Sequence, residues 1–295
     1  MDGNLKFLSN KNGFLGIDNK FSFKEKAIVI AFGLEKTVSY GGVTKNGPKE
    51  IIKASHQVEL YDEELNCEPF KKIGIKTLKP FKIDKNINKA LGKVSKINEN
   101  ILKKNIFPLT LGGEHSITPG CIYPFTKKYK NLCILHFDAH ADLRESYNGE
   151  KYSHASAIRR CLDYKNVSLI SFGIRNISKG EIPFMKKNSS RIKIFWAKDK
   201  EKWNLTMFKK FIKNKTVYLT FDVDAFDSGI MPATGTPEPG GLLWDETLKI
   251  IKIAMKNSKV VGADVNELAP IKGFNSYNFL VAKLVYKILS YKFFY

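Results

Sequence analysis

The amino-acid sequence predicts an α/β protein in which helices cover both faces of a mostly parallel sheet. Two observations lead to this fold class. Short runs of β-branched and aliphatic residues recur along the chain without the polar alternation of a half-exposed strand. Amphipathic segments of helical length lie between these runs. No linker, repeat or low-complexity tract interrupts the order, so we predict a single domain over residues 1–295.

The apolar runs are the predicted strands. They occupy residues 26–32, 107–113, 131–139, 167–174, 191–197, 216–224 and 259–267. Four stretches with helical spacing are predicted helices, at residues 47–65, 87–104, 244–257 and 276–295. Pro48 suits the first turn of the first of these helices, because proline has no backbone N–H to donate there.

The net charge of +20 first suggests a nucleic acid or an acidic lipid as partner. Only five of the 49 basic residues are arginines, however, and the remaining 44 lysines are spread along the whole chain. Arginine is the residue whose planar fork suits phosphate. We therefore interpret the charge as a solvated surface and expect no specific nucleic-acid partner and no membrane partner. The alternative, a basic nucleic-acid or membrane-surface binder, would bind with steep salt dependence.

The four cysteines form no C-x-x-C pair, which argues against a disulfide scaffold and a thiolate zinc site. The first residues contain no apolar signal segment, and no run approaches 18 apolar residues. We therefore expect a cytoplasmic protein without a membrane span.

Acidic residues and histidines follow four of the predicted strands directly. In open parallel sheets, ligands bind beyond the carboxyl ends of the strands, so these side chains are expected to converge there. Four of the five histidines lie between positions 115 and 154. The strand-end residues are Glu114, His115 and Ser116; Asp138, His140 and Asp142; Asp222 and Asp224; and Glu267.

Six of these strand-end residues are candidate metal ligands: His115, Asp138, His140, Asp142, Asp222 and Asp224. They comprise four carboxylates and two imidazoles, which would crowd a single metal but suit two divalent ions that share bridging carboxylates. Mixed oxygen and nitrogen ligation suits Mn²⁺ and could also hold Ni²⁺, Co²⁺, Fe²⁺ or Zn²⁺. Two ions about 3.5 Å apart can bridge a water and lower its pKa. His136 lies within a predicted strand, and we expect it to pack rather than to bind metal.

Several motifs, in order along the chain, resemble those of the ureohydrolases, the arginase/agmatinase family. The resemblance covers nearly the whole chain, because residues 39–42 and 47–52 also look like the N-terminal segment of this family. The sequence has Glu114 where many relatives have Asp. The matching motifs are residues 112–116, 136–142, 152–156, 221–227, 233–242 and 264–270.

The resemblance implies a three-layer α/β/α sandwich around an eight-stranded, mainly parallel sheet, assembled as a homotrimer or homohexamer. It also implies two Mn²⁺ ions per subunit, with Ni²⁺ or Co²⁺ possible. One ion would be held by His115, Asp138, Asp142 and Asp222. The other would be held by Asp138, His140, Asp222 and Asp224, so that Asp138 and Asp222 bridge.

The expected reaction is hydrolysis of a guanidino group to urea and an amine. Glu267, just past a strand end, would accept two parallel N–H bonds from the planar guanidinium. Asp142 would relay a proton to the departing amine, and His154 matches the family's histidine for proton transfer near the mouth. Catalytic residues are thus expected at Asp142, His154 and Glu267, and substrate-binding residues at His154 and Glu267.

Residues 142–154 carry Tyr147, Asn148 and Gly149 and resemble agmatinases more than arginases. Agmatine, cleaved to putrescine and urea in polyamine biosynthesis, is therefore the first substrate hypothesis. The alternatives are a guanidinobutyrase, guanidinopropionase, arginase, guanidine hydrolase or formimidoylglutamase, and, from another class, a single-zinc deacylase. Four of the five arginines (144, 159, 160 and 175) lie near the motifs, where they would pair carboxylates, cap helices or bind a substrate carboxylate.

Overall fold

The computed structural model describes residues 5–18, 21 and 24–295. Eight parallel strands form one sheet in the order β2-β1-β3-β8-β7-β4-β5-β6, which confirms the predicted fold class. The strands are β1 (Ala27–Phe32), β2 (Ile75–Thr77), β3 (Phe107–Gly112), β4 (Leu132–Phe137), β5 (Val167–Phe172), β6 (Ile192–Phe195), β7 (Thr216–Asp222) and β8 (Lys259–Asn266). That the chain forms a single domain stays a prediction.

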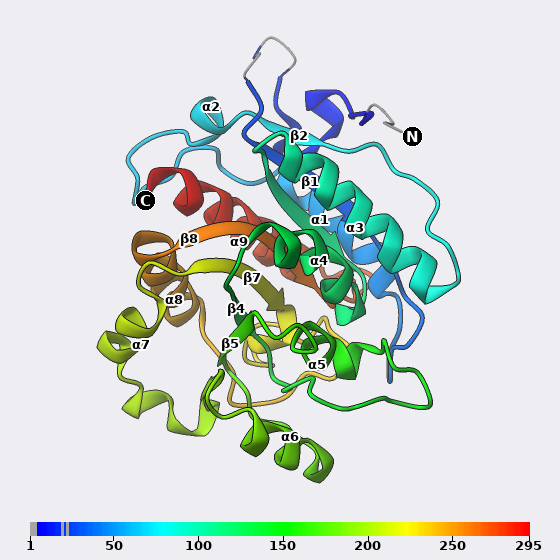
Figure 1. Ribbon diagram of the computed structural model, residues 1–295. Helices are drawn as coiled ribbons and strands as arrows, with labels where there is room; N and C mark the ends of the chain where they lie inside the picture. The colour runs from blue at the N-terminus through cyan, green and yellow to red at the C-terminus, as the bar shows by residue number, and fades with distance from the viewer. Residues whose placement is uncertain (1–4, 19–20, 22–23) are drawn as a thin grey trace.

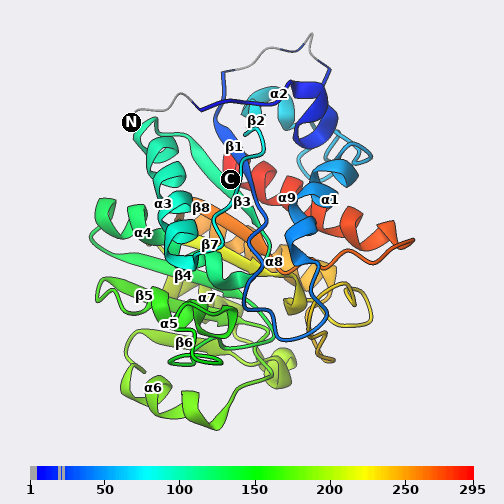
Figure 2. The ribbon, with the colours of Figure 1, turned by 90° about the vertical axis from the view of Figure 1, so that its right-hand side faces the viewer.

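Helices cover both faces of the sheet, because successive strand residues point to opposite sides and both sides are apolar. In β4, Cys133 and Leu135 pack toward α1, α7, α8 and α9, whereas Leu132 and Ile134 pack toward α3, α4 and α5. Figure 2 shows α3 and α4 on one side of the strands and α1 and α9 on the other. The helices are α1 (Gly47–Ser55), α2 (Phe70–Ile73), α3 (Ile87–Lys103), α4 (Thr118–Lys128), α5 (Ala157–Cys161), α6 (Ile182–Lys187), α7 (Leu205–Ile212), α8 (Trp244–Asn257) and α9 (Asn275–Phe294). None of these helices combines the length and the apolar composition needed to cross a bilayer.

The helix predicted over residues 47–65 is too long, because α1 ends at Ser55. The chain beyond it is folded by polar contacts instead. Asp62 exchanges backbone hydrogen bonds with Cys67, and its side chain accepts the N–H groups of Glu64 and Leu65. These bonds close a turn and leave the following residues outside a helix.

Six strands or α-helices escaped sequence-based prediction: strand β2 and helices α2, α4, α5, α6 and α7. Strand β2 pairs with β1 at the edge of the sheet. It has three residues, which is too short to form a recognisable apolar run in the sequence. Helix α4 contains Gly120 and Pro124, both unfavourable in a helix interior. Gly120 is needed there because a Cβ atom at this position would lie 2.8 Å from the Leu91 oxygen of α3, so the glycine allows the two helices to pack closely.

The sheet order brings the four strands that precede the polar motifs together. β3, β8, β7 and β4 are consecutive neighbours in the middle of the sheet, although they come from two separate stretches of the chain, 107–137 and 216–266. Figure 1 shows β8, β7 and β4 near the centre of the molecule, and Figure 2 shows β3 next to β8. Their carboxyl ends therefore lie next to one another at the same edge of the sheet, where the side chains that follow them can meet.

Candidate metal centre

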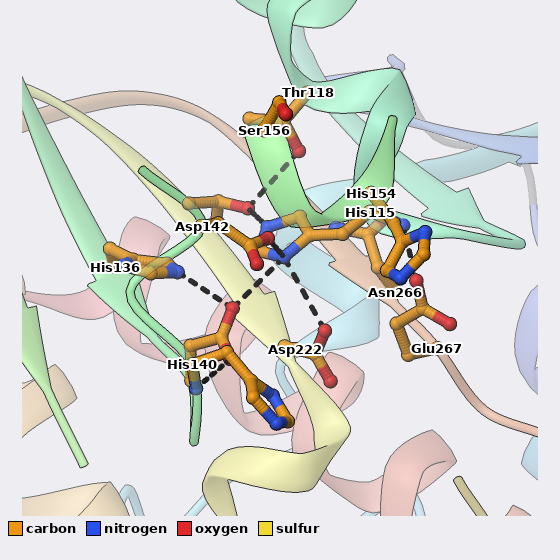
Figure 3. Close-up of polar contacts among 12 residues, drawn as sticks. His115, Thr118, His136, His140, Asp142, His154, Ser156, Asp222, Asn266 and Glu267 are labelled. Carbon is orange, nitrogen blue, oxygen red and sulfur yellow. Dashed lines mark hydrogen bonds and ion pairs between the residues drawn. The ribbon is translucent and has the colours of Figure 1, made fainter. Parts of the chain in front are cut away.

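Buried acidic side chains surround His115 at the carboxyl ends of the four central strands. His115 begins the turn after β3, and its Nδ1 lies 3.0 Å from Asp138, 3.2 Å from Asp142 and 3.4 Å from Asp222, in each case to a carboxylate oxygen. Figure 3 shows the imidazole between the carboxyl groups that follow β4 and β7. Nδ1 makes no hydrogen bond within the described part of the chain. A buried ring nitrogen facing three carboxylates without such a bond is an arrangement that a shared cation would complete.

A second group of side chains lies next to the first and shares Asp138 with it. The Nδ1 atom of His140 lies 2.9 Å from a carboxylate oxygen of Asp224 and 3.6 Å from one of Asp138. Asp222 joins the two groups, since its carboxylate accepts the backbone N–H of Asp224 at 2.9 Å and also faces His115. The structure therefore brings together all six residues that the sequence suggested as ligands.

The charges of these groups are unbalanced. No lysine or arginine among the described residues forms an ion pair with Asp138, Asp142, Asp222, Asp224 or Glu267; their ion pairs are all with histidines. Burial and the neighbouring carboxylate of Asp138 raise the pKa of Asp142 to about 7. Burial and the carboxylates of Asp224 and Asp138 raise the pKa of Asp222 well above its usual range.

Divalent cations fit this donor set. Burying several ionised carboxylates without counter-charge is costly, and cations relieve that cost while using both oxygen and imidazole donors. Burial would lower the pKa of His115, but the carboxylates of Asp138, Asp142 and Asp222 hold it well above its usual value. The raised pKa values of His115, Asp142 and Asp222 have the same cause, which is the excess of negative charge in this cluster.

Hydrogen bonds behind the site orient the proposed ligands. The Nε2 atom of His115 lies 2.8 Å from the Thr220 hydroxyl, which itself donates to the buried carboxylate of Asp264 at 2.6 Å. This pairing leaves Nδ1 facing the carboxylates. His136 is fully buried, as predicted, but it also holds Asp138, with 2.8 Å between Nε2 and the carboxylate. No sequence pattern singles out Thr220, which looks like any polar residue in a strand.

Two of the predicted catalytic residues adopt the left-handed backbone conformation that side chains disfavour. Asp142 has a φ of 52° and Glu267 a φ of 68°. Neighbouring segments hold both in place: Arg159 N donates to the Asp142 carbonyl at 2.9 Å, and Glu267 N donates to the Gly113 carbonyl at 2.7 Å. Such strained positions persist where the surrounding structure fixes them, and they cluster at functional sites.

A cavity of about 250 Å³ opens above these carboxylates. Glu267, His154 and Tyr147 line it, together with residues of the 38–40 and 234–236 loops. One carboxylate oxygen of Glu267 accepts the backbone N–H of His115 at 2.6 Å. His154 stands at the side of the cavity, with its ring 5.5 Å from that of Tyr147. Burial, and then positive charge on His140 and His115, lowers the pKa of His154 to about 4, so the imidazole is neutral near pH 7.

The arginines near the motifs have different surroundings. Arg159 and Arg160 pair with Glu145, and Arg144 lines the cavity, where its guanidinium lies 5.2 Å from the centre of the Tyr147 ring. Arg144 forms no ion pair with the described residues. Arg175 donates instead to backbone oxygens and ties together the loops beside the site, through the carbonyls of Gly173, Asp224, Phe226, Glu238 and Pro239.

Known proteins agree with this fold. A sequence profile of the Arginase family matches residues 25–290. The chain belongs to the arginase family. It is 33% identical to the N(1)-aminopropylagmatine ureohydrolase of Synechocystis sp., over 97% of this chain and 95% of that protein. It is 35% identical to an agmatinase of Bacillus anthracis, over 90% of this chain and 92% of that protein.

Among solved structures, the agmatine ureohydrolase of Thermoplasma volcanium superimposes with a TM-score of 0.84 at 26% identity, covering 99% of this chain and 96% of that one. The predicted membership of an agmatinase-like hydrolase family is therefore confirmed. The assignment of individual side chains to metal binding or catalysis, including that of His154 and Glu267, stays a prediction.

Proposed function

We propose that this protein hydrolyses agmatine to putrescine and urea with two Mn²⁺ ions. The observation that carries the proposal is the group of buried, uncompensated carboxylates under a cavity of about 250 Å³. Four of them suit two divalent ions, and Glu267, which is outside the ligand sets, suits a cationic substrate headgroup. Similarity to agmatinases over most of the chain supports the choice of agmatine. Family membership alone already makes a guanidino compound the substrate class.

The ligand sets follow the two groups of side chains in the structure. His115, Asp138, Asp142 and Asp222 would hold one ion, and Asp138, His140, Asp222 and Asp224 the other. When bound, the ions supply Lewis-acid chemistry, lowering the pKa of a water and stabilising negative charge in the transition state. The buried Thr220–Asp264 pair keeps Nδ1 of His115 turned toward this site.

The remaining roles belong to side chains that line the cavity. Glu267 orients the planar guanidinium by accepting its N–H groups, which aligns the carbon for attack. Asp142 takes the proton of the attacking water and delivers it to the leaving nitrogen. His154, neutral near pH 7, exchanges protons between the leaving amine and the mouth.

A second candidate substrate has a carboxylate on its tail, as guanidinobutyrate does. Arg144 favours it, because this guanidinium lines the cavity and forms no ion pair with the described residues. The guanidinium of Arg144 lies over the Tyr147 ring. A free cation at the mouth would attract an anionic tail and repel the ammonium group of agmatine.

A urea-release panel tests both candidates. Purified protein is loaded with Mn²⁺ or Ni²⁺ and given agmatine, N(1)-aminopropylagmatine, arginine, guanidinobutyrate, guanidinopropionate or guanidine. We expect agmatine to have the highest kcat/KM with Mn²⁺. We also expect Arg144→Ala to change the relative kcat/KM values of the substrates that have anionic tails. Highest activity on guanidinobutyrate would establish the second candidate, and no urea from any compound would refute the proposal. A metal content near one per chain would favour the single-zinc deacylase.

We also propose a cytoplasmic location and assembly as a homotrimer or homohexamer. All four cysteines are free thiols, as expected in a reducing compartment. Light scattering after size-exclusion chromatography would measure the assembly, and a monomer at micromolar concentration would refute it.

A further inference from the structure

The loop that follows β1 is fixed to the site by Glu114. This side chain is fully buried, and one of its carboxylate oxygens accepts the backbone N–H groups of Lys36 at 2.8 Å and Thr37 at 2.6 Å. Its other oxygen accepts the Ser116 hydroxyl. Glu114 immediately precedes His115, so one short segment both contributes to the carboxylate cluster and anchors a loop that is about 77 residues away in sequence.

Two hydroxyl groups of the anchored loop contact both ring nitrogens of His154. The Thr37 hydroxyl lies 3.1 Å from Nδ1, and the Ser39 hydroxyl lies 2.8 Å from Nε2. Thr37 also accepts the backbone N–H of His154 at 3.0 Å. The loop therefore fixes the backbone of His154 and the rotation of its ring together.

A hydroxyl can donate and accept, which makes this pair suited to a proton-exchanging imidazole. A neutral imidazole has one donor and one acceptor nitrogen, and either tautomer is satisfied by Thr37 and Ser39 if their hydroxyls rotate. Ser39 is exposed and lines the cavity, so a substrate amine can replace it at Nε2 while Thr37 still holds Nδ1.

We propose that Glu114, Thr37 and Ser39 form a positioning unit for His154, in which the buried carboxylate anchors the loop and the two hydroxyls aim the ring into the cavity. The role of His154 in proton transfer rests on the function proposed above, whereas the aiming itself does not. Glu114 suits this task because its carboxylate reaches two N–H groups on a different segment; an aspartate would be one methylene shorter.

The test is a double-mutant cycle between Thr37 and His154 in the Mn²⁺-loaded enzyme. Thr37→Val keeps the shape and removes the hydroxyl, and we expect kcat to fall about 10- to 100-fold while KM changes less than about threefold. Thr37→Ser should recover kcat to within about threefold. In a His154→Ala background, Thr37→Val should cost less than about twofold further, because the ring it positions is gone.

Thr44→Val is the matched control, since Thr44 lies on the same loop and its hydroxyl donates to Glu35 rather than to His154. We expect its kcat to stay within about threefold of the parent. An equal loss from Thr37→Val with and without His154 would overturn the positioning unit and leave the proposed function intact.

A second measurement does not depend on activity. Nitrogen-15 spectra of the histidine rings, recorded on Zn²⁺-loaded protein, should show the His154 signals shifted by Thr37→Val and by Glu114→Asp but unmoved by Thr44→Val. Unchanged His154 signals in both variants would refute the inference, even if no urea were released from any substrate.

Discussion

Two clusters of acidic side chains in the protein contain buried aspartates, and the charges of these aspartates are balanced in opposite ways. Far from the cavity, the Asp62 carboxylate lies 3.0 Å from the ammonium group of Lys287, and both residues are 1% exposed. Glu63 and Glu64 also face this lysine, at 3.2 Å and 3.6 Å. Burial would lower the pKa of Lys287, but these carboxylates, led by Asp62, raise it.

The strand-end cluster has no such partner among the described residues, although the chain contains 44 lysines. Its described ion pairs involve histidine alone. In these two clusters the contrast separates structural from functional charge: Lys287 neutralises Asp62, whereas no lysine among the described residues pairs with the strand-end carboxylates, and their place is open to a divalent cation. Net charge says nothing about this difference, because the two clusters occur in one molecule with one overall charge of +20.

The largest effect should come from breaking the neutralised cluster. Lys287→Met leaves the buried Asp62 carboxylate without its ammonium partner, so we expect the free energy of unfolding to fall by about 3–5 kcal/mol in urea titrations. Urea release per folded molecule should not change. Lys283→Met on the same helix is the control, because Lys283 forms no ion pair with the described residues, and equal losses from both variants would contradict the comparison.

A smaller but opposite result should follow in the strand-end cluster. Asp222→Asn keeps an oxygen that can accept the Asp224 N–H and removes a repelling charge, so metal-free stability should hold or rise. Activity with Mn²⁺ should fall at least about 100-fold, which corresponds to about 2.7 kcal/mol. Asp62→Asn, at an equally buried aspartate, should do the reverse: lower stability, with kcat within about threefold. Loss of both properties in both variants would remove the distinction.

Removing the Thr220 hydroxyl, which contacts Nε2 of His115, should weaken metal binding although no proposed ligand is replaced. Thr220→Val breaks the link from Nε2 of His115 to Asp264, and we expect Mn²⁺ affinity to fall about 10- to 100-fold in calorimetric titrations. Thr126→Val, a threonine whose hydroxyl caps the Tyr123 carbonyl in α4, is the matched control and should leave the affinity unchanged. An unaltered Kd in Thr220→Val would mean that His115 needs no such support.

The smallest expected effect is a pH dependence of the metal-free protein. His115, His140, Asp142 and Asp222 all have raised pKa values in the folded state. The folded protein therefore binds more protons than the unfolded chain and loses stability as pH rises. Between pH 7 and 8.5, His136 and His154, whose pKa values are lowered, are neutral in both states and do not oppose this trend. Thermal unfolding in chelator should give a Tm that falls over this interval, less steeply in Asp222→Asn. A rising Tm would contradict it.

Much of the site could be predicted because the same local rule applies four times. An apolar strand such as 132–137 has to end where the chain becomes polar, and Asp138 stands at that point. Parallel strands put such ends on one edge, so convergence followed from fold class alone. The order of the strands could not be predicted in the same way. Nothing in the sequence indicates that β3, β8, β7 and β4 are immediate neighbours, because apolar strands of similar composition carry no signal of their order.

What sequence reasoning missed depends on contacts between distant segments. Thr37 contacts His154 across 117 positions, and nothing in the sequence marks Thr37 itself, although residues 39–42 beside it resemble a family segment. Asp62 and Lys287 are 225 positions apart, and each looks like an ordinary surface residue in the printed sequence. Both pairs exist only because folding places two loops or helices together, which local patterns do not encode.

The cavity is built from two kinds of structure, and this division bears on how such a protein can diversify. The carboxylates at its floor stand on the ends of buried central strands, whereas its mouth is formed by loops such as 38–40 and 234–236. Loops tolerate exchange and insertion far better than central strands do. Descendants of one ancestor could therefore acquire new substrate tails by remodelling the mouth, while the machinery that cleaves the carbon–nitrogen bond is inherited without change.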